Sequence, residues 1–457
     1  MSNVILKIGG GILRSKDSFD RVVSIIKSKK DLGEKQIIVI SALFGVTDFL
    51  IKSLDECLLD QGIVEKKITE LKKMHYDYLE FISNEGIRKN AKFVLEDKIS
   101  ILEKFLYGVS YLKEISPRSK DLVQSFGERL SPIILEAFLL DAGVKAKFID
   151  AEEAGIKCLG QFENAYVDLN STSKSIKEKA GYLLENTIVL LPGYYGIDES
   201  GDVKTFGRGG TDYSSGFIAN IFDAKLEVWK DVSGFMTADP KVVPKAKQIE
   251  MLSYNEAEEL GYLGAKILHP KTIDPLRVKG LCAEVKNVFA PEVKGTIICG
   301  ERQKDSSIVK SISAIKDIAL VSVQSSSMVN VPGFASALFS KLAEKSISID
   351  IIVTSEASIS FSVDPKRVDD AVLAVQSISN QFPLSVSIMK DLSVVALVGE
   401  GIKETSGVAG KLFTAIGSNA INVELISQGA SEINITFAIK KADLDRAVKL
   451  VHEQFIE

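Results

Sequence analysis

Short apolar runs alternate with polar or glycine-containing segments along the first half of the chain. The first run, VILKI, ends on three glycines and is followed by a helical stretch from Ser18 to Ser28. A second run, QIIVISA, begins at Gln36, and similar runs recur at 147–149, 187–191 and 226–229. A strand, a glycine turn, a helix and a further strand in this order predict an α/β fold, whose parallel-rich central sheet has helices on both faces.

A helical lobe interrupts this alternation. Between Asp48 and Leu112, Lys, Glu and Leu recur at helical spacing, and Gly and Pro are almost absent. Pro117 and Ser119 break the pattern, and the next helix is predicted from about Glu128 to Asp141. We therefore expect a lobe of long helices over about residues 48–135.

The last third of the chain repeats itself. VPGFASALFSKLAEKSISID, from Val331 to Asp350, aligns with TSGVAGKLFTAIGSNAINVE, from Thr405 to Glu424. Gly333 then matches Gly407, and the apolar positions of the following helix match as well. Each copy spans about 70 residues and reads as strand, glycine turn, helix, strand, strand. The repeat predicts two ferredoxin-like βαββαβ units.

A polar stretch separates the repeat from the rest of the chain. Between Gly295 and Ser311 the composition changes to GERQKDSS. A chain of 457 residues is too long for one hydrophobic core, because a domain holds about 150 residues. We expect one large domain over residues 1–300 and two repeat units over 308–387 and 388–457.

Composition and charge indicate a folded globular protein and argue against some classes of function. The chain has 56 basic and 61 acidic side chains, a formal charge of −5, and 46% hydrophobic residues, which is typical of a folded globular protein. Without a dominant Lys/Arg block, binding to nucleic acid or to an anionic membrane is not expected. The sequence has neither a signal-peptide pattern nor an apolar run near the roughly 18 residues of a membrane span, so we predict a cytoplasmic protein.

Cysteine and histidine chemistry is not indicated. The cysteines lie outside any CxxC or Cys/His metal spacing, and the three histidines are far apart in the sequence. We expect buried, reduced thiols at all four cysteines: Cys57, Cys158, Cys282 and Cys299.

The first segment that could carry chemistry is Lys7 with Gly9, Gly10 and Gly11, at the end of the first predicted strand. Glycines let backbone N–H groups converge on an anion, and a lysine can neutralise a transferred phosphate. A tight turn that merely joins a strand to a helix explains the pattern equally well.

The second segment is TFGRGGTDYSS, from Thr205 to Ser215, ahead of an apolar helix. Arg208 suits a bidentate grip on a carboxylate, and Asp212 can orient a lysine or a metal ion. The alternative is a capped loop with a surface Arg–Asp pair, but the density of glycine and charge favours a functional loop.

Two later segments are turn-rich. Lys230 to Pro244 follows the predicted strand LEVW, and ligands of open α/β sheets bind at the carboxyl ends of such strands. An ordinary surface connection is an equally good interpretation. In GAKILHPKT we predict a phosphate contact for Lys266 and a structural role for His269, because Pro270 indicates a rigid turn.

Taken in this order, together with LSYNEAEELGYLGAKILHP and the repeat pair, the segments resemble the aspartokinase family over essentially the whole chain. The resemblance implies an amino-acid kinase fold followed by two ACT domains. It also implies transfer of the γ-phosphoryl group of ATP to the β-carboxylate of L-aspartate, the first step toward lysine, threonine and methionine, with feedback regulation through the ACT pair.

The resemblance also implies a role for each matching residue. As catalytic residues, Lys7 and Lys266 would hold phosphates and Asp212 would orient Lys7. Arg208 would bind a carboxylate of the amino acid, and Glu128 would lie near its ammonium group. The remaining amino-acid contacts would be Ser41, Ala42, Thr47, Gly209 and Thr211. The ATP site would be lined by Lys7, Gly9, Gly10, Lys230, Asp231, Met236, Lys241 and Lys266. Mg²⁺ would be held mainly by the nucleotide phosphates.

Several positions depart from the family's usual residues. The usual hydroxyl pair after the glycines is replaced by Gly11 and Ile12, and Tyr194, Lys230 and Met236 stand for the usual Phe, Thr and Tyr. These changes leave two alternatives open: a kinase of the same lineage for a related amino acid such as homoserine, and a non-catalytic subunit that senses amino acids. Retention of the two site lysines and of Asp212 argues against the silent subunit, because buried charges are costly to keep.

The first repeat unit resembles the ACT version that binds lysine. Met328, Asp350 and Glu356 are the residues implied to meet the effector, lysine or threonine. The alternative is that Asp350 is a strand-end acid and Glu356 a solvated surface residue. ACT units generally bury their effector between chains, so a homodimer or a larger homo-oligomer is expected.

Overall fold

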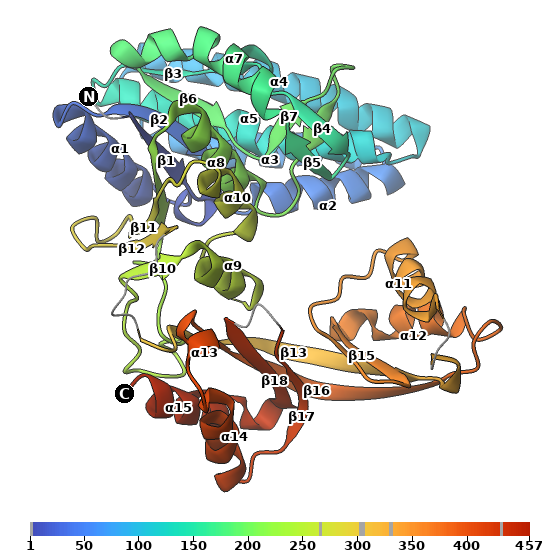
Figure 1. Cartoon of the computed structure of the whole chain (residues 1–457). Coiled ribbons are helices and arrows are strands. Elements are labelled where there is room, and N and C mark those ends of the chain that lie inside the picture. Colours follow the sequence, from blue (N-terminus) through green and yellow to red (C-terminus); the bar gives the residue numbers. More distant parts are fainter. Residues whose placement is uncertain (1–2, 265–266, 301–306, 329–331, 430–432) are drawn as a thin grey trace. The chain divides into compact units, whose positions relative to one another are not determined.

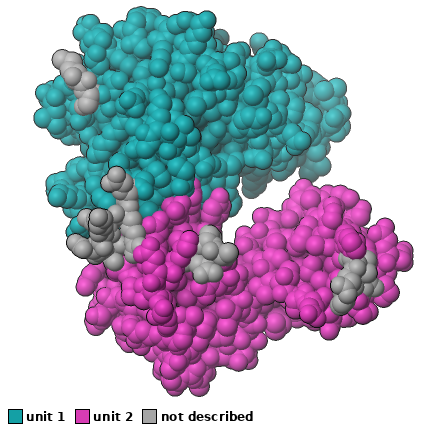
Figure 2. Space-filling view, viewed as in Figure 1, with its two compact units in different colours: residues 1–235, 250–254, 266–301 teal, residues 236–249, 255–265, 302–457 magenta. Residues whose placement is uncertain are grey.

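The computed structural model describes residues 3–264, 267–300, 307–328, 332–429 and 433–457. It divides into two compact units, which Figure 2 shows in different colours. The first unit comprises residues 1–235, 250–254 and 266–301, and the second comprises 236–249, 255–265 and 302–457. Two short segments within the range 1–300 thus belong to the second unit, which the sequence pattern did not predict.

An eight-stranded sheet forms the centre of the first unit (Figure 1), in the order β10-β12-β11-β9-β1-β2-β6-β3. Neighbours are parallel except at the β11–β12 pair. The strands are β1 (Asn3–Ile8), β2 (Lys35–Ile40), β3 (Ala146–Phe148), β6 (Ile188–Pro192), β9 (Lys225–Lys230), β10 (Met251–Ser253), β11 (Ala283–Asn287) and β12 (Thr296–Cys299). The predicted parallel-rich sheet is confirmed.

Helices cover both faces of this sheet. On β1, Val4, Leu6 and Ile8 belong to the core cluster formed with α1 and α5, whereas Lys7 pairs with a residue of α8 on the other side. This alternation follows from the two-residue period of a strand. The helices are α1 (Lys16–Asp31), α2 (Val46–Leu59), α3 (Ile63–Leu79), α4 (Glu85–Leu112), α5 (Pro117–Asp141), α6 (Ala151–Ala154), α7 (Leu169–Lys179), α8 (Gly210–Phe222) and α10 (Ile273–Arg277). Two hairpins, β4 (Cys158–Gln161) with β5 (Asn164–Val167) and β7 (Tyr195–Ile197) with β8 (Val203–Thr205), complete the unit.

The start of α5 corrects the sequence prediction. The helix was expected from about Glu128, but it begins at Pro117, with Ser116 as its N-cap accepting a hydrogen bond from the Ser119 backbone N–H at 3.1 Å. Proline is well suited to the first helical position because its missing N–H needs no partner there. Glu128 therefore lies in the middle of α5, is 4% exposed, and is not a first-turn acid.

The second unit contains an antiparallel six-stranded sheet in the order β14-β15-β13-β16-β18-β17. Its elements are α9 (Tyr254–Tyr262), β13 (Ser311–Gln324), α11 (Phe334–Glu344), β14 (Ile352–Thr354), β15 (Ser358–Val363), α12 (Val368–Gln376), β16 (Ser385–Val398), α13 (Gly401–Glu404), α14 (Val408–Ser418), β17 (Val423–Ser427), β18 (Asn434–Lys440) and α15 (Leu444–Phe455). Helix α9 begins at Tyr254, which ends the first unit's segment 250–254, and its other residues belong to the second unit.

The two repeats share their long strands. The second half of β13 and the first half of β16 pair within the first repeat's sheet, and the other halves of both pair within the second. Each repeat therefore has the ferredoxin-like strand order, with its fourth strand supplied by the other repeat. The predicted fold is confirmed, and the sharing of β13 explains why its start contributes Ile312 to the core of the second repeat.

The cysteines differ from their expectation. Cys57 and Cys158 are buried and free, as predicted, but Cys282 and Cys299 form a disulfide with a Cα–Cα distance of 4.6 Å. The antiparallel register of β11 and β12, in which Ala283 pairs with Ile298, places these two cysteines opposite each other. Among the described residues, no helix is long and apolar enough to cross a membrane.

Candidate active site

A buried ion pair lies at the end of the central strand. Lys7 Nζ is 2.6 Å from Asp212 Oδ1, and both side chains are at most 10% exposed. Lys7 is the last residue but one of β1, and Asp212 is in the first turn of α8, which packs on that face. Burial alone would raise the pKa of Asp212, but the charges of Lys7 and Lys230 lower it to about 2. Asp212 is therefore ionised throughout the physiological pH range.

A second lysine approaches the same carboxylate. Lys230 ends β9, the strand beside β1, and its Nζ lies 3.8 Å from Asp212 Oδ2. Burial lowers the pKa of Lys230, and the charge of Asp212 partly offsets this. Two cations around one buried carboxylate leave a net positive charge, which suits an anionic ligand.

The glycine turn after β1 is held close to its neighbours. Gly9 donates its backbone N–H to the Trp229 carbonyl at 3.2 Å, and a Cβ on Gly9 would lie 3.4 Å from Lys7 Nζ. A Cβ on Gly10 would lie only 2.8 Å from the Ala42 carbonyl oxygen. Gly10 is therefore needed where the backbone after β1 passes the loop after β2.

A cavity of about 270 Å³ opens beside this turn. Its walls come from the glycine turn, the loop after β2, the first turn of α2, and α5. The lining residues are Gly10, Ser41, Ala42, Leu43, Phe44, Gly45, Thr47, Asp48 and Glu128. Four predicted amino-acid contacts, from three separate elements, thus line one cavity.

Glu128 is the buried acid of this cavity. Thr211 Oγ1 donates to its Oε1 at 3.3 Å, whereas Oε2 has no hydrogen-bond partner among the described residues. Burial raises the pKa of Glu128 to about 7, and hydrogen bonding by the Ala42 backbone and by Thr211, together with the charge of Lys7, only partly offsets this. A buried carboxylate oxygen without a partner suits a ligand that brings a positive charge.

The Arg208 loop, residues 206–209, joins β8 to α8. Arg208 is exposed and has no ion pair with another described residue. Gly209 is in the left-handed region, with φ of 75°, and a Cβ there would lie 2.1 Å from the His269 ring. His269 caps a short 3₁₀ helix by accepting from the Lys271 N–H at 3.3 Å, which agrees with the structural role predicted for it.

The remaining predicted residues are distributed as follows. Asp231 follows β9 and is exposed, whereas Met236 and Lys241 belong to the second unit. Lys266 lies outside the described residues. Of the two departures after the glycines, Gly11 is exposed with open space around it and Ile12 is buried in the core, so neither lines the cavity.

The sequence missed two polar residues near the site. Asp121 and Gln124, on α5 with Glu128, are buried, and they hydrogen-bond to Thr205 and Tyr194 respectively. Tyr194 has a φ of 79°, uncommon for a residue with a side chain. The only available signal was their spacing, since positions 121, 124 and 128 fall on one face of a helix.

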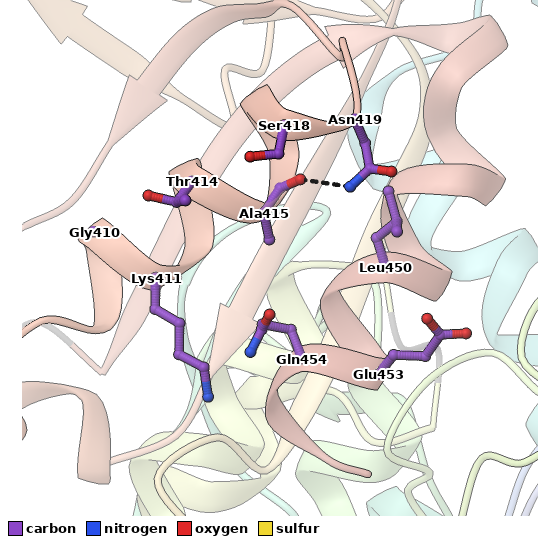
Figure 3. Close-up of a pocket in the computed structure, with 9 residues that line it drawn as sticks. All are labelled: Gly410, Lys411, Thr414, Ala415, Ser418, Asn419, Leu450, Glu453 and Gln454. Atoms are coloured by element: carbon purple, nitrogen blue, oxygen red, sulfur yellow. Dashed lines mark hydrogen bonds between the residues drawn. The ribbon is translucent and has the colours of Figure 1, made fainter.

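The predicted effector residues lie around the first repeat's sheet. Met328 packs against its core, and Asp350 and Glu356 are exposed before and after the short strand β14. A cavity of about 570 Å³ lies in the second repeat, between α14 and α15. Figure 3 shows its small and polar lining, including Lys411, Glu453 and Gln454. It contains none of the predicted effector residues.

Comparison with known proteins agrees with this architecture. Residues 3–287 match the amino acid kinase family, and residues 321–378 and 395–455 match an ACT domain family. Aspartokinase 2, chloroplastic, of Arabidopsis thaliana is 30% identical over 464 residues, covering 99% of this chain and 84% of the relative.

Solved structures agree over the whole chain. E. coli aspartokinase III in complex with aspartate and ADP (R-state) has a TM-score of 0.84 and 25% identity, and covers 100% of both chains. The same enzyme with lysine and aspartate (T-state) also has a TM-score of 0.84. Clostridium acetobutylicum aspartate kinase has a TM-score of 0.79 and 30% identity, with 99% of this chain and 100% of that chain covered. The chain therefore belongs to the amino acid kinase family and, within it, to the aspartokinases, as an aspartate kinase with ACT domains.

Proposed function

We propose that the chain transfers the γ-phosphoryl group of ATP to the β-carboxylate of L-aspartate, with the acceptor in the cavity beside Gly10 and the phosphates at Lys7. The observation that carries this proposal is the position of the glycine turn. Gly10 lines the cavity that contains Glu128, and its neighbour Gly9 packs against Lys7. Acceptor and phosphate would thus meet across two adjacent glycines.

The acceptor would be held by opposite charges. The ammonium group of aspartate would face Glu128, whose Oε2 is buried without a partner among the described residues. A carboxylate would face Arg208, because a planar guanidinium grips a carboxylate through two hydrogen bonds. Ser41, Ala42, Thr47, Gly209 and Thr211 would complete the acceptor site.

Phosphoryl transfer would depend on positioning and charge. A carboxylate oxygen attacks the γ-phosphorus, the bond to the β,γ-bridging oxygen breaks, and ADP leaves, so no covalent enzyme intermediate is needed. Lys7, oriented by Asp212, would neutralise the charge on the transferred group, and Lys230 would add a second positive charge. Gly9, Asp231 and Lys266 would complete the nucleotide contacts from the first unit.

Mg²⁺ would be held mainly by the nucleotide. Asp212 is engaged by two lysines, and no cluster of three or more metal-ligating side chains occurs among the described residues. When bound, the ion would neutralise part of the negative charge of the ATP phosphates.

Regulation is proposed to act through lysine at the first ACT unit, with Met328, Asp350 and Glu356 as contacts. The T-state structure of E. coli aspartokinase III in complex with lysine and aspartate supports lysine over threonine as the effector. Because ACT effectors are generally bound between chains, we propose a homodimer or a larger homo-oligomer.

The experiment that tests the activity measures ATP consumption with aspartate, with homoserine and without an acceptor, all with Mg²⁺. ATP consumption that depends on aspartate is expected. Consumption that depends only on homoserine would contradict the proposal, and no acceptor-dependent consumption would indicate a sensing subunit.

A further inference from the structure

One face of α5 carries three buried polar side chains. Asp121, Gln124 and Glu128 are 0%, 5% and 4% exposed, and their spacing of three and four residues aligns them along the helix. Buried polar groups require partners, because an unsatisfied one costs about 1–3 kcal/mol. The partners of all three lie in segments that surround the Arg208 loop.

Asp121 accepts three hydrogen bonds. Its Oδ2 accepts from the backbone N–H of Thr205 at 2.9 Å and of Glu163 at 2.8 Å, and its Oδ1 accepts from Thr205 Oγ1 at 2.7 Å. None of these donors belongs to α5. Asp121 therefore links the helix to Thr205, the last residue of β8 before the Arg208 loop.

The other end of the loop is linked to the same helix. Thr211, in the first turn of α8 after the loop, donates its hydroxyl to Glu128 at 3.3 Å, and Glu128 is seven positions after Asp121. Between the two ends, Lys271 Nζ donates to the Phe206 carbonyl at 3.1 Å. The loop that contains Arg208 is thus fastened to one rigid helix on both sides.

Gln124, which lies between Asp121 and Glu128 on α5, makes a further contact. Its Oε1 accepts from the Tyr194 hydroxyl at 2.5 Å, and the Tyr194 ring lies so close to Gly210 that a Cβ there would be 2.8 Å away. Gly210 is the first residue of α8. This hydrogen bond depends on the Tyr194 hydroxyl, which the phenylalanine usual at this position in the family would lack.

We propose that Asp121 is a positioning residue, which fixes the separation of Arg208 and Glu128 and thereby sets the affinity for the acceptor amino acid. The inference rests on the proposed function, in which these two groups hold opposite ends of aspartate. Glu128 is a residue of α5, and the loop that carries Arg208 is hydrogen-bonded to the same helix. Loss of the Asp121 contacts therefore releases Arg208, while Glu128 stays in place. Lys7 and Asp212 lie on β1 and α8 and keep their own ion pair.

The test compares KM values for the two substrates. Asp121→Asn removes the negative charge and replaces one of the two acceptor oxygens with an NH₂ donor, which weakens the contacts to Thr205 and Glu163, so the KM for aspartate should rise about tenfold or more while the KM for ATP stays within about twofold. Thr205→Val, which removes the hydroxyl but keeps the shape, should change the two KM values in the same pattern. Thr205→Ser keeps the hydroxyl and should remain close to wild type.

Glu136→Gln is the matched control. Glu136 is a half-buried acid of the same helix, and its Oε1 accepts from the Phe148 N–H at 3.0 Å, away from the loop. It should leave both KM values within about twofold of wild type. If Asp121→Asn does not fold, the comparison of Thr205→Val with Thr205→Ser decides the question.

The possible results are distinguishable. An unchanged KM for aspartate in folded Asp121→Asn or Thr205→Val, or an equal rise in both KM values, would overturn the proposal. Arg208→Lys separates this failure from that of the acceptor site. If Arg208→Lys raises the KM for aspartate but Asp121→Asn and Thr205→Val do not, only the positioning role of Asp121 is wrong. If Arg208→Lys has no effect, the acceptor assignment itself falls.

Discussion

Lys7 Nζ and Asp212 Oδ1 lie 2.6 Å apart, although 205 positions separate the two residues in the chain. The contact exists because Lys7 is on the α8 face of the central strand and Asp212 is in the first turn of α8. A lysine held by a buried carboxylate loses little conformational freedom when it binds phosphate, since its position is already fixed.

Replacing Lys7 with alanine should reduce kcat by about 10² or more, because one positioned charge that stabilises the transition state is worth about that much. The fold should survive, since Lys230 still faces Asp212 at 3.8 Å. Steady-state kinetics with circular dichroism measures both. Lys29→Ala is the control, as it removes another partly buried lysine paired with an acid, Glu227, at 2.9 Å. Turnover within a few-fold of wild type would contradict the catalytic role and indicate that Lys7 is only a structural residue of the turn.

The affinity for aspartate should depend on pH through Glu128. Because burial raises its pKa to about 7 from the ordinary 4.5, the carboxyl is neutral below pH 7 and cannot pair with an ammonium group. The KM for aspartate should therefore fall as the pH rises from 6 to 8. Glu128→Gln should give a high KM without this dependence, and the same pH profile in the variant would exclude Glu128 as its source.

Glu128 should also make the stability of the protein depend on pH, and stability should fall with rising pH where the affinity for aspartate rises. Between pH 4.5 and about 7 the folded state holds a proton on Glu128 that the unfolded chain has released. The free energy of unfolding should accordingly fall as the pH rises through this window. Glu128→Gln should lessen this fall in thermal or denaturant unfolding of the ligand-free protein.

Lysine should bind the first ACT unit and inhibit, with a coupling of roughly 1–3 kcal/mol between effector and substrate sites. Thermal-shift and activity titrations with lysine, threonine and methionine measure this. Glu356→Ala should abolish the lysine response, because an ammonium group of lysine would lose its carboxylate partner. Glu424→Ala, at the position of the second repeat that aligns with Asp350, is the control. A lysine response that Glu356→Ala leaves unchanged would remove this site.

The sequence predicted the sheet and the repeat, because those depend on local patterns. Four of the nine residues that line the acceptor cavity were named as amino-acid contacts only through the family resemblance: Ser41, Ala42, Thr47 and Glu128. The glycine turn and the apolar run before it specify the end of β1 directly. The repeat could be aligned because the same turn and helix face recur at Gly333 and Gly407. The burial of Glu128 could not be predicted, since the N-cap at Ser116 placed the helix start eleven positions earlier than expected.

Features that depend on long-range pairing were missed. The disulfide between Cys282 and Cys299 follows from strand register, which no spacing rule for cysteines contains. Each of the strands β13 and β16 contributes one half to the sheet of each repeat. This depends on the unusual length of both strands, which the sequence did not reveal. The role of Asp121 requires knowledge that Thr205, 84 positions away, lies beside it.

The identity of the phosphorylated group is the central claim, and trapping the product tests it most directly. An acyl phosphate reacts with hydroxylamine at its carbonyl carbon, releasing phosphate and leaving a hydroxamate, whereas a phosphate ester of a hydroxyl group does not. Incubation with Mg²⁺, ATP, aspartate and hydroxylamine should give the β-hydroxamate of aspartate, and homoserine in place of aspartate should give none. ATP consumption with homoserine, and no hydroxamate from aspartate, would contradict the account.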